Sequence, residues 1–148
     1  MRKPCGRDDE EMEERVWRIL DALGLMEVAN NTPGMIDLGK RRRVALARAA
    51  VLRPEVLLFD QPLVGLNYRQ QGWWRDLISE LSLGHEIMGD KPVTVVVTTA
   101  NFWDWLDHAR KFALLGHGVF KVVGDRKRMQ ACDDPIAREL LQTEQSTN

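Results

Sequence analysis

An aspartate and a glutamine that follow a short apolar run are the residues of this sequence best placed to do chemistry. The run is residues 56–59 (VLLF), and Asp60 and Gln61 come directly after it. A carboxylate at the end of a buried strand can hold a hydrated magnesium ion, and a second carboxylate beside it can activate water as a general base. Gln61 keeps the shape of a glutamate but cannot accept a proton. The pair indicates either a nucleotide-hydrolysing site with one residue changed or a site that no longer hydrolyses anything.

Helices and strands alternate along the chain on both sides of this pair. The spacing of apolar residues predicts helices over residues 8–23, 39–52 and 68–83, a helix that begins near 101, and a last helix over 135–141. Strands are predicted over 55–60, where the apolar run indicates a buried strand, and over 93–99, 112–115 and 119–123. One face of the 68–83 helix is predicted to carry Trp74, Leu77, Ile78 and Leu81. This alternation favours an α/β layer with a mostly parallel sheet.

Composition limits the classes of protein to which the chain can belong. A length of 148 residues, with 44% hydrophobic and 29% charged residues, is typical of one globular domain. The formal net charge of −1 argues against a general electrostatic attraction to nucleic acid or to an anionic membrane. Cys5 and Cys132 lie far apart, which indicates free thiols in a reducing compartment. Because no apolar run is long enough to span a bilayer, we expect any membrane association to go through a partner.

The order of the predicted elements resembles the C-terminal half of an ABC-transporter ATPase domain. Residues 43–60 (RVALARAAVLRPEVLLFD) resemble the family's signature helix, turn and Walker B strand, and residues 61–67 (QPLVGLN) fall on its D-loop. Residues 93–101 (VTVVVTTAN) resemble the strand before the switch histidine, and 114–125 (LLGHGVFKVVGD) the closing hairpin. Residues 59–67 and 77–81 are most similar to ATPases of lipid-asymmetry transport systems. The resemblance implies an incomplete, ABC-type P-loop NTPase fold, a mostly parallel sheet with flanking helices.

The resemblance also implies a division of the chain. It predicts an N-terminal tail over residues 1–9, a remnant of the helical subdomain over 10–35, and the C-terminal half of the ATPase core over 36–125. A C-terminal helix and polar tail are expected over 126–148. The phosphate-cradling motif GxxxxGK[ST], which lies upstream of these parts in the family, does not occur in the 148 residues.

The family's signature motif, Leu-Ser-Gly-Gly-Gln, is degenerate in this sequence. It reads Ile36, Asp37, Leu38, Gly39, Lys40. In the family the serine and the glycine amides contact the γ-phosphate, so Asp37 places a carboxylate against that phosphate. One such repulsion at ~4 Å and an effective dielectric constant of about 20 is on the order of 4 kcal/mol. Lys40 offsets part of it, but we do not expect a working signature.

The remaining positions with a chemical role in the family are also changed. Asp60 keeps the Walker B magnesium position, but Gln61 replaces the catalytic glutamate, a loss that typically costs about 10²–10⁴ in rate. In the D-loop, Gly65, Leu66 and Asn67, the family's aspartate is replaced by Asn67, and Thr99 aligns with the switch histidine. The family uses ATP and magnesium. For the isolated chain we expect no cofactor, no metal site and no ATP hydrolysis.

Two features of the sequence suggest a protein partner. In the family the phosphate-loop strand lies between the switch-loop strand and the final strands. Without it, the strands at 93–99 and 112–115 leave a gap, which predicts either a marginal fold or pairing with another chain or a second copy. Trp73 and Trp103 lie off the predicted apolar faces. Each is either part of an interface or partly buried against a neighbouring element.

Several functional readings remain open. The chain is a catalytically dead remnant, or an interaction or regulatory subunit that docks on a complete ABC ATPase or its permease, or it contributes half a site in trans; Asp37 argues against the third. Residues 40–43 (KRRR) invite a nucleic-acid-binding reading, but no aromatic residue interleaves with them and this helix start is basic in the family. His85, His108 and His117 show no metal-ligand spacing. The resemblance implies a cytoplasmic location, peripheral to the inner membrane through a partner.

Overall fold

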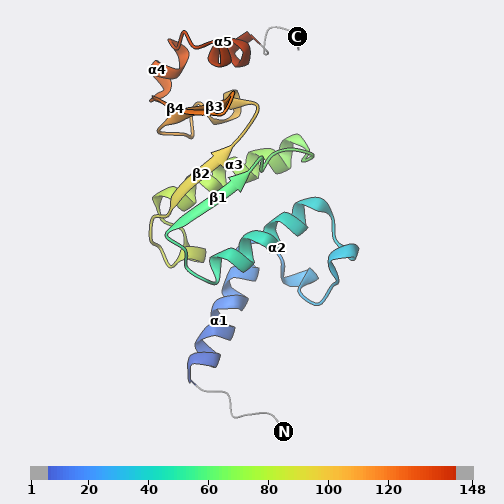
Figure 1. Cartoon of the computed structure of the whole chain (residues 1–148). Coiled ribbons are helices and arrows are strands. Elements are labelled where there is room, and N and C mark those ends of the chain that lie inside the picture. The colour runs from blue at the N-terminus through green and yellow to red at the C-terminus, as the bar shows by residue number, and fades with distance from the viewer. Residues whose placement is uncertain (1–6, 143–148) are drawn as a thin grey trace. The chain divides into compact units, whose positions relative to one another are not determined.

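The computed structural model describes residues 7–142, which group into two compact units that meet within one strand, between Val97 and Thr98. The first unit contains α1 (Arg7–Ala22), α2 (Leu38–Ala50), β1 (Val56–Asp60), α3 (Tyr68–Leu83) and β2 (Thr94–Thr98) (Figure 1). The second contains β3 (Phe112–Gly116), β4 (Val119–Gly124), α4 (Arg126–Gln130) and α5 (Pro135–Gln142). Short 3₁₀ turns lie at Met26–Val28, Pro33–Met35, Glu86–Met88 and Phe102–Trp105. Residues 1–6 and 143–148, which include Cys5 and most of the predicted tails, lie outside the described residues.

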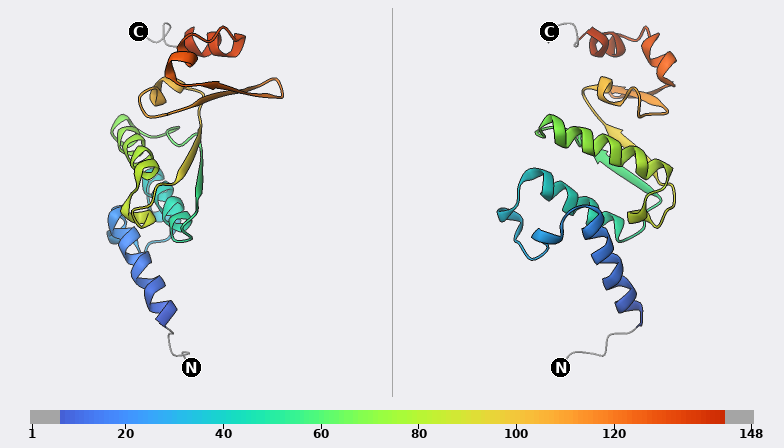
Figure 2. Two further views of the ribbon diagram at one scale, coloured as in Figure 1. Left: turned by 90° about the vertical axis from the view of Figure 1, so that its left-hand side faces the viewer. Right: turned by 180° about the vertical axis from the view of Figure 1, so that it is seen from behind.

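The predicted helix over residues 68–83 is confirmed as α3, and so is its apolar face. Trp74, Leu77, Ile78 and Leu81 are all buried. Figure 2 shows α3 lying along one side of the strand pair β1–β2. The ring of Phe59 on β1 meets the ring of Trp74 edge-on, with 6.2 Å between their centroids. The covered face of the strand pair therefore packs against α3.

The strand pair β1–β2 is covered on one face only. The two strands are hydrogen-bonded neighbours, and their arrows run in the same direction (Figure 1). On β1, Leu57 is 6% exposed whereas Leu58 is 77% exposed. Val56 and Val96, on the same face as Leu58, are about half exposed. The prediction of a strand at 55–60 is confirmed as β1, but the prediction that it is buried is wrong. Its apolar residues lie on two faces, and among the described residues only one of these faces is covered by a helix.

The second unit is a β-hairpin that packs on short helices. β3 and β4 pair in antiparallel register, with Leu115 opposite Phe120. The core of this unit is formed by Phe102, Leu106, Phe112, Leu114, Met129 and Ala137. The hairpin around the Gly116–Gly118 turn, predicted from the sequence, is confirmed.

The helix predicted to begin near residue 101 is wrong in length. Only the 3₁₀ turn Phe102–Trp105 forms, followed by a tight turn in which the Ala109 amide donates to the Trp105 carbonyl at 2.8 Å. The apolar residues Phe102, Trp105 and Leu106 are nevertheless buried. Three aromatic rings within four residues favour a helix only weakly, so packing of the rings decides the local backbone. The short helix α4, which begins after the capping residue Asp125, was not predicted.

The described residues form two separate two-stranded sheets, β1–β2 and β3–β4. No described strand joins β2 to β3, which agrees with the predicted gap. Whether another chain fills it stays a prediction, and so do the predicted domain boundaries. Among residues 7–142 no helix is long and apolar enough to cross a membrane.

Candidate functional site

The N-terminus of α2 is occupied by a side chain of the same chain. Asp37 is the N-cap residue, with extended backbone, and its carboxylate accepts a hydrogen bond from the Lys40 backbone N–H at 3.0 Å. This hydrogen bond is the main cause that lowers the pKa of Asp37. A carboxylate is favourable here because the first N–H groups of a helix lack intrahelical partners and carry partial positive charge. The anion that this helix end would attract is therefore already present in the chain.

The predicted signature and D-loop residues lie against each other. A Cβ atom added to the buried Gly39 would come within 2.6 Å of Gln70 Nε2 and 3.0 Å of Asp37 Oδ1. A Cβ atom on Gly65 would lie 3.3 Å from the side chain of Leu38. Only a residue without a side chain fits at position 39 while Gln70 stays in place. We call this region the signature corner; its residues are Asp37, Leu38, Gly39, Gly65, Leu66, Asn67 and Gln70.

Asn67, at the D-loop aspartate position, has a structural role as the cap of α3. Its side chain accepts from the Gln70 backbone N–H at 3.0 Å, and the Gln70 side chain accepts from the Asn67 backbone N–H at 3.2 Å. This reciprocal pair is a capping box. Gln71 Nε2 donates to the Leu66 carbonyl at 2.9 Å and so holds the loop before the helix. Sequence reasoning missed Gln70, although the spacing Asn-x-x-Gln before an apolar run was a signal for it.

The basic residues at the start of α2 also contact their own chain. Lys40 Nζ lies 2.8 Å from Glu27 Oε1, and this ammonium lowers the pKa of Glu27 through their hydrogen bond. Arg42 Nη1 donates to the Pro62 carbonyl at 2.7 Å, in the loop that follows β1. Lys40 and Arg42 thus connect α2 to neighbouring segments of the chain. These intramolecular contacts explain the basic residues at 40–43 without a role in nucleic-acid binding.

Trp73, one of the two predicted interface tryptophans, lies beneath Arg43. The guanidinium carbon of Arg43 is 3.8 Å from the Trp73 ring centroid, and Nη1 donates to the Leu23 carbonyl at 3.2 Å. Burial of this guanidinium lowers the pKa of Arg43. Trp73 also meets Trp74 edge-on at 5.3 Å and is half buried. Trp73 therefore has an intramolecular packing role, and an interface role stays a prediction.

Asp60 and Gln61 end β1 with an unusual backbone. Gln61 has φ 45°, a left-handed conformation that is uncommon for a residue other than glycine. Its carbonyl accepts from the Val64 N–H at 3.3 Å. Asp60 is exposed. The backbone strain thus falls at Gln61, where the family resemblance predicts a general base.

Asp60 lies at the predicted magnesium position, and whether it binds the ion stays a prediction. Magnesium is usually held by one or two carboxylates together with waters and substrate phosphates. Within residues 7–142 no group of three or more His, Cys, Asp and Glu side chains could hold a metal ion. Asp60 supplies one carboxylate, and its neighbour Gln61 supplies an amide in place of a second one.

The remaining predicted residues, Thr99 and Trp103, belong to the second unit. The Thr99 hydroxyl donates to the Asn101 carbonyl at 2.9 Å and accepts from the Asn101 N–H at 3.0 Å, so it closes a local turn. Trp103 is half buried and packs on Phe102, with 4.8 Å between ring centroids. Its indole Nε1 is buried and has no hydrogen-bond partner among the described residues. Trp103 thus packs against a neighbouring ring, and an interface role stays a prediction.

The match to a known family concerns the part of the chain that holds α1, α2 and β1. Residues 2–64 match the ABC transporter family. The chain is a homologue of ABC-transporter ATP-binding subunits. It is 34% identical, over 122 residues, to the intermembrane phospholipid transport system ATP-binding protein MlaF of Escherichia coli K12, a match covering 82% of this chain and 43% of MlaF. It is 32% identical, over 132 residues, to the spermidine/putrescine import ATP-binding protein PotA of Trichodesmium erythraeum, covering 88% of this chain and 33% of PotA.

Solved ABC structures share the fold of this ABC homologue. A subunit of the CbiONQ transporter complex from Clostridium perfringens superposes with a TM-score of 0.69 at 21% identity, over 98% of this chain and 54% of the other. An ATP-binding cassette in its ADP conformation gives a TM-score of 0.67 at 18% identity, over 90% of this chain and 50% of the other. The chain thus spans about half the length of the solved cassettes and less than half of MlaF. Its α/β fold is that of an incomplete ABC cassette.

Proposed function

We propose that this chain is a degenerate half of an ABC ATP-binding subunit and does not hydrolyse ATP by itself. The observation that carries the proposal is the Asp37 carboxylate on the N-terminus of α2, 3.0 Å from the Lys40 backbone nitrogen. In the family that the signature resembles, the γ-phosphate is held at this position. A phosphate brought to within ~4 Å of the carboxylate would meet a repulsion on the order of 4 kcal/mol at an effective dielectric constant of about 20. A nucleotide phosphate is therefore excluded from the signature corner.

The catalytic positions support the same proposal. Gln61 cannot take a proton from water, and the loss of a positioned general base costs about 10²–10⁴ in rate. The Thr99 hydroxyl is hydrogen-bonded to the Asn101 backbone, and threonine has no imidazole ring that could replace the switch histidine. The 148 residues contain no GxxxxGK[ST] motif to hold the phosphates. We therefore expect the described residues to have no ATPase activity of their own.

The transporter context of the chain is part of the proposal. We propose that the chain acts on the cytoplasmic side of a membrane, bound to a permease or to a complete ABC ATPase; its similarity to transporter ATP-binding subunits supports this proposal. Its transported substrate does not follow from the relatives, because MlaF and PotA are 34% and 32% identical to it and are named for phospholipid and for spermidine/putrescine. The choice between a remnant and an interaction subunit depends on whether such a partner binds.

Nucleotide binding and hydrolysis by the purified full chain test the proposal. We expect no phosphate release above the blank and no saturable binding of a fluorescent ATP analogue with Mg²⁺. Asp37→Ser restores the family's residue and Asp37→Asn removes the charge while it keeps a capping side chain, so the two variants separate charge repulsion from loss of the cap. Mg²⁺-dependent phosphate release that Asp60→Asn abolishes would overturn the proposal.

A second function, an interaction subunit, is favoured by the uncovered apolar strands of both units. The tagged chain should recover a permease or a complete ABC ATPase from its native host in near-stoichiometric amounts, as identified by mass spectrometry. Recovery of chaperones and proteases alone would favour a remnant.

A further inference from the structure

A cavity of about 440 Å³ lies in the first unit, at the end of the strand pair where both strands begin. Residues 53–55, which lead into β1, and most of residues 88–94, which lead into β2, line it. Because β1 and β2 run in the same direction, their first residues meet at one edge of the sheet (Figure 1). Asp60 and Gln61 follow the opposite end of β1, so a strand length of about 13 Å separates them from the cavity. The cavity is therefore distinct from the candidate site described above.

The two segments that line the cavity are fixed by backbone hydrogen bonds. The Thr94 N–H donates to the Glu55 carbonyl at 3.0 Å, which joins the two segments to each other. The Val93 N–H donates to the Leu81 carbonyl at 3.0 Å and so holds the second segment on α3. Arg53 has φ 49°, and its N–H donates at 2.9 Å to a carbonyl in the last turn of α2. The backbone around the cavity is therefore held in one arrangement.

Much of the lining is apolar. Met88 and Val93 are 3% and 4% exposed, and Pro54 and Pro92 add apolar rings. Sites for small molecules are typically cavities of about 300–1,000 Å³ with an apolar lining and a few polar groups. The size and lining of this cavity therefore suit a small ligand with an apolar body.

Three charged side chains line the same cavity. Arg53 comes from the first segment, Lys91 from the second, and Glu55 is the one acid in the lining. All three residues are exposed, and among residues 7–142 none of their side chains forms an ion pair or a hydrogen bond. Asp90, which precedes Lys91 in the sequence, does not line the cavity. The lining therefore has a net positive charge that the described part of the chain does not balance.

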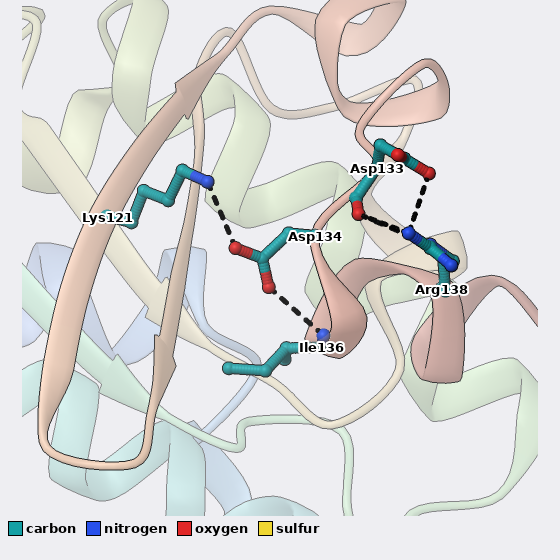
Figure 3. Close-up of polar contacts among 5 residues, drawn as sticks. All are labelled: Lys121, Asp133, Asp134, Ile136 and Arg138. Atoms are coloured by element: carbon teal, nitrogen blue, oxygen red, sulfur yellow. Dashed lines mark hydrogen bonds and ion pairs between the residues drawn. The ribbon is translucent and has the colours of Figure 1, made fainter.

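Cations of the second unit show the contrasting case, in which acids of the chain balance the charge. Lys121 Nζ lies 3.0 Å from Asp134 Oδ2 (Figure 3). Arg138 Nη2 lies 3.0 Å from Asp133 Oδ1 in the same figure. The two cations of the cavity have no such partner, and an anion from outside the chain can supply one.

We propose that this cavity binds a small phosphate monoester, with the phosphate held by Arg53 and Lys91. The organic group of the ligand packs on Met88 and Val93. A phosphate monoester carries a charge of about −1.5 to −2 at pH 7, which two cations can balance, and a guanidinium can donate two parallel hydrogen bonds to its oxygens. Glu55 repels the same ligand and limits the affinity. This site goes beyond the proposed function and does not depend on it.

The test is a titration of the isotope-labelled full chain with phenyl phosphate, followed by the NMR shifts of the backbone amides. We expect saturable shifts confined to residues 53–55 and 88–94. Arg53→Gln and Lys91→Gln should each weaken binding by about tenfold, because each removes a charge-assisted hydrogen bond. Glu55→Gln should tighten binding by about twofold to fivefold, because it removes a repulsion between exposed groups. Arg69→Gln, at an exposed cation of α3 outside the cavity, is the matched control and should leave binding unchanged.

Other outcomes overturn the site or its ligand. Absence of saturable shifts, or equal weakening by Arg69→Gln, would overturn the site. Equally tight binding of phenol or of benzoate would overturn the choice of a phosphate monoester. Shifts centred on residues 37–40 would place the phosphate at the signature corner and overturn both this site and the proposed exclusion of phosphate there. Should Arg53→Gln or Lys91→Gln lose its fold in circular dichroism, Glu55→Gln decides the question, because unfolding cannot produce a gain of affinity.

Discussion

The signature corner of the first unit and the exposed face of the β3–β4 hairpin, which carries Leu115 and Phe120, differ in one respect. Polar groups at the signature corner have hydrogen-bond partners within the chain, whereas apolar side chains on the hairpin face are exposed. At the signature corner Asp37, Asn67 and Gln70 cap helices, and Gly39 is packed beneath Gln70. On the exposed hairpin face, the side chain of Leu115 is 73% exposed and that of Phe120 is 68% exposed. The polar groups of the signature corner are thus satisfied within the chain, whereas apolar side chains of the hairpin are exposed. A helix cap depends on one or two residues, whereas an apolar pattern on both faces of a strand depends on every residue of the strand.

The largest expected effect comes from two neighbouring leucines on opposite faces of β3. Leu114→Ala should destabilise the second unit by about 2–5 kcal/mol, because it removes buried methyl groups and leaves a cavity. Leu115→Ala should change the free energy of unfolding by no more than about 0.5 kcal/mol, because the side chain is mostly exposed. Urea unfolding followed by amide exchange at residues 112–124 measures both. Equal losses of unfolding free energy in the two variants would mean that the hairpin face carrying Leu115 is covered, which would contradict the comparison.

A smaller effect is expected at the cap of α2. Asp37→Ala should cost about 1 kcal/mol, because the Lys40 N–H loses its acceptor, whereas Asp37→Asn should keep most of the stability. The pKa of Asp37 is lowered in the folded chain, so the unfolded state binds the proton more readily. The stabilisation by the charged cap is therefore complete at neutral pH and is lost as the pH falls below about 4. Thermal melts from pH 7 to pH 3 should show the wild type losing its advantage over Asp37→Asn; a constant difference would contradict this role.

The Arg43–Trp73 contact should contribute less. Trp73→Leu keeps apolar volume but removes the aromatic face under the guanidinium, at an expected cost of about 0.5–1 kcal/mol. Trp73→Phe keeps a ring and should cost less, which makes it the control. If Trp73 belongs instead to an interface, both variants should leave the melting temperature of the isolated chain unchanged and weaken only the binding of a partner.

The smallest effect is expected at the exposed pair that joins the hairpin to α5. The hydrogen bond from Lys121 is the main cause that lowers the pKa of Asp134, and the same bond raises the pKa of Lys121. The contribution of Asp134 is present above its ordinary pKa and is lost as the pH falls below about 4; that of Lys121 is lost only when the pH rises above about 10. Lys121→Met should lower the melting temperature slightly at pH 7 and not at pH 3, and high salt should reduce the difference. A salt-independent loss would indicate packing by the lysine stem.

The helix at 68–83 and the strand at 94–98 could be predicted from the sequence, because the helix has a clear apolar period and the strand is rich in β-branched residues. The short 3₁₀ turn after Asn101 could not be predicted, because packing of the aromatic rings of Phe102, Trp103 and Trp105 decides the backbone there. The capping box of Asn67 and Gln70 was readable but was missed. The contact between Gly39 and Gln70 was not readable, since the two residues lie on different helices.

The sequence by itself determined the chemical limits of the candidate site. Gln61 cannot act as a general base in any fold, and Asp37 supplies a carboxyl group where the family has a hydroxyl. Only the tertiary structure decided what those residues do instead: Asp37 caps α2, and Asn67 caps α3. It also decided which face of each apolar strand is covered. The physical reason is that residue type fixes acidity and hydrogen-bonding capacity, and periodicity fixes which residues share a face, but only the neighbouring elements determine whether that face meets protein or water.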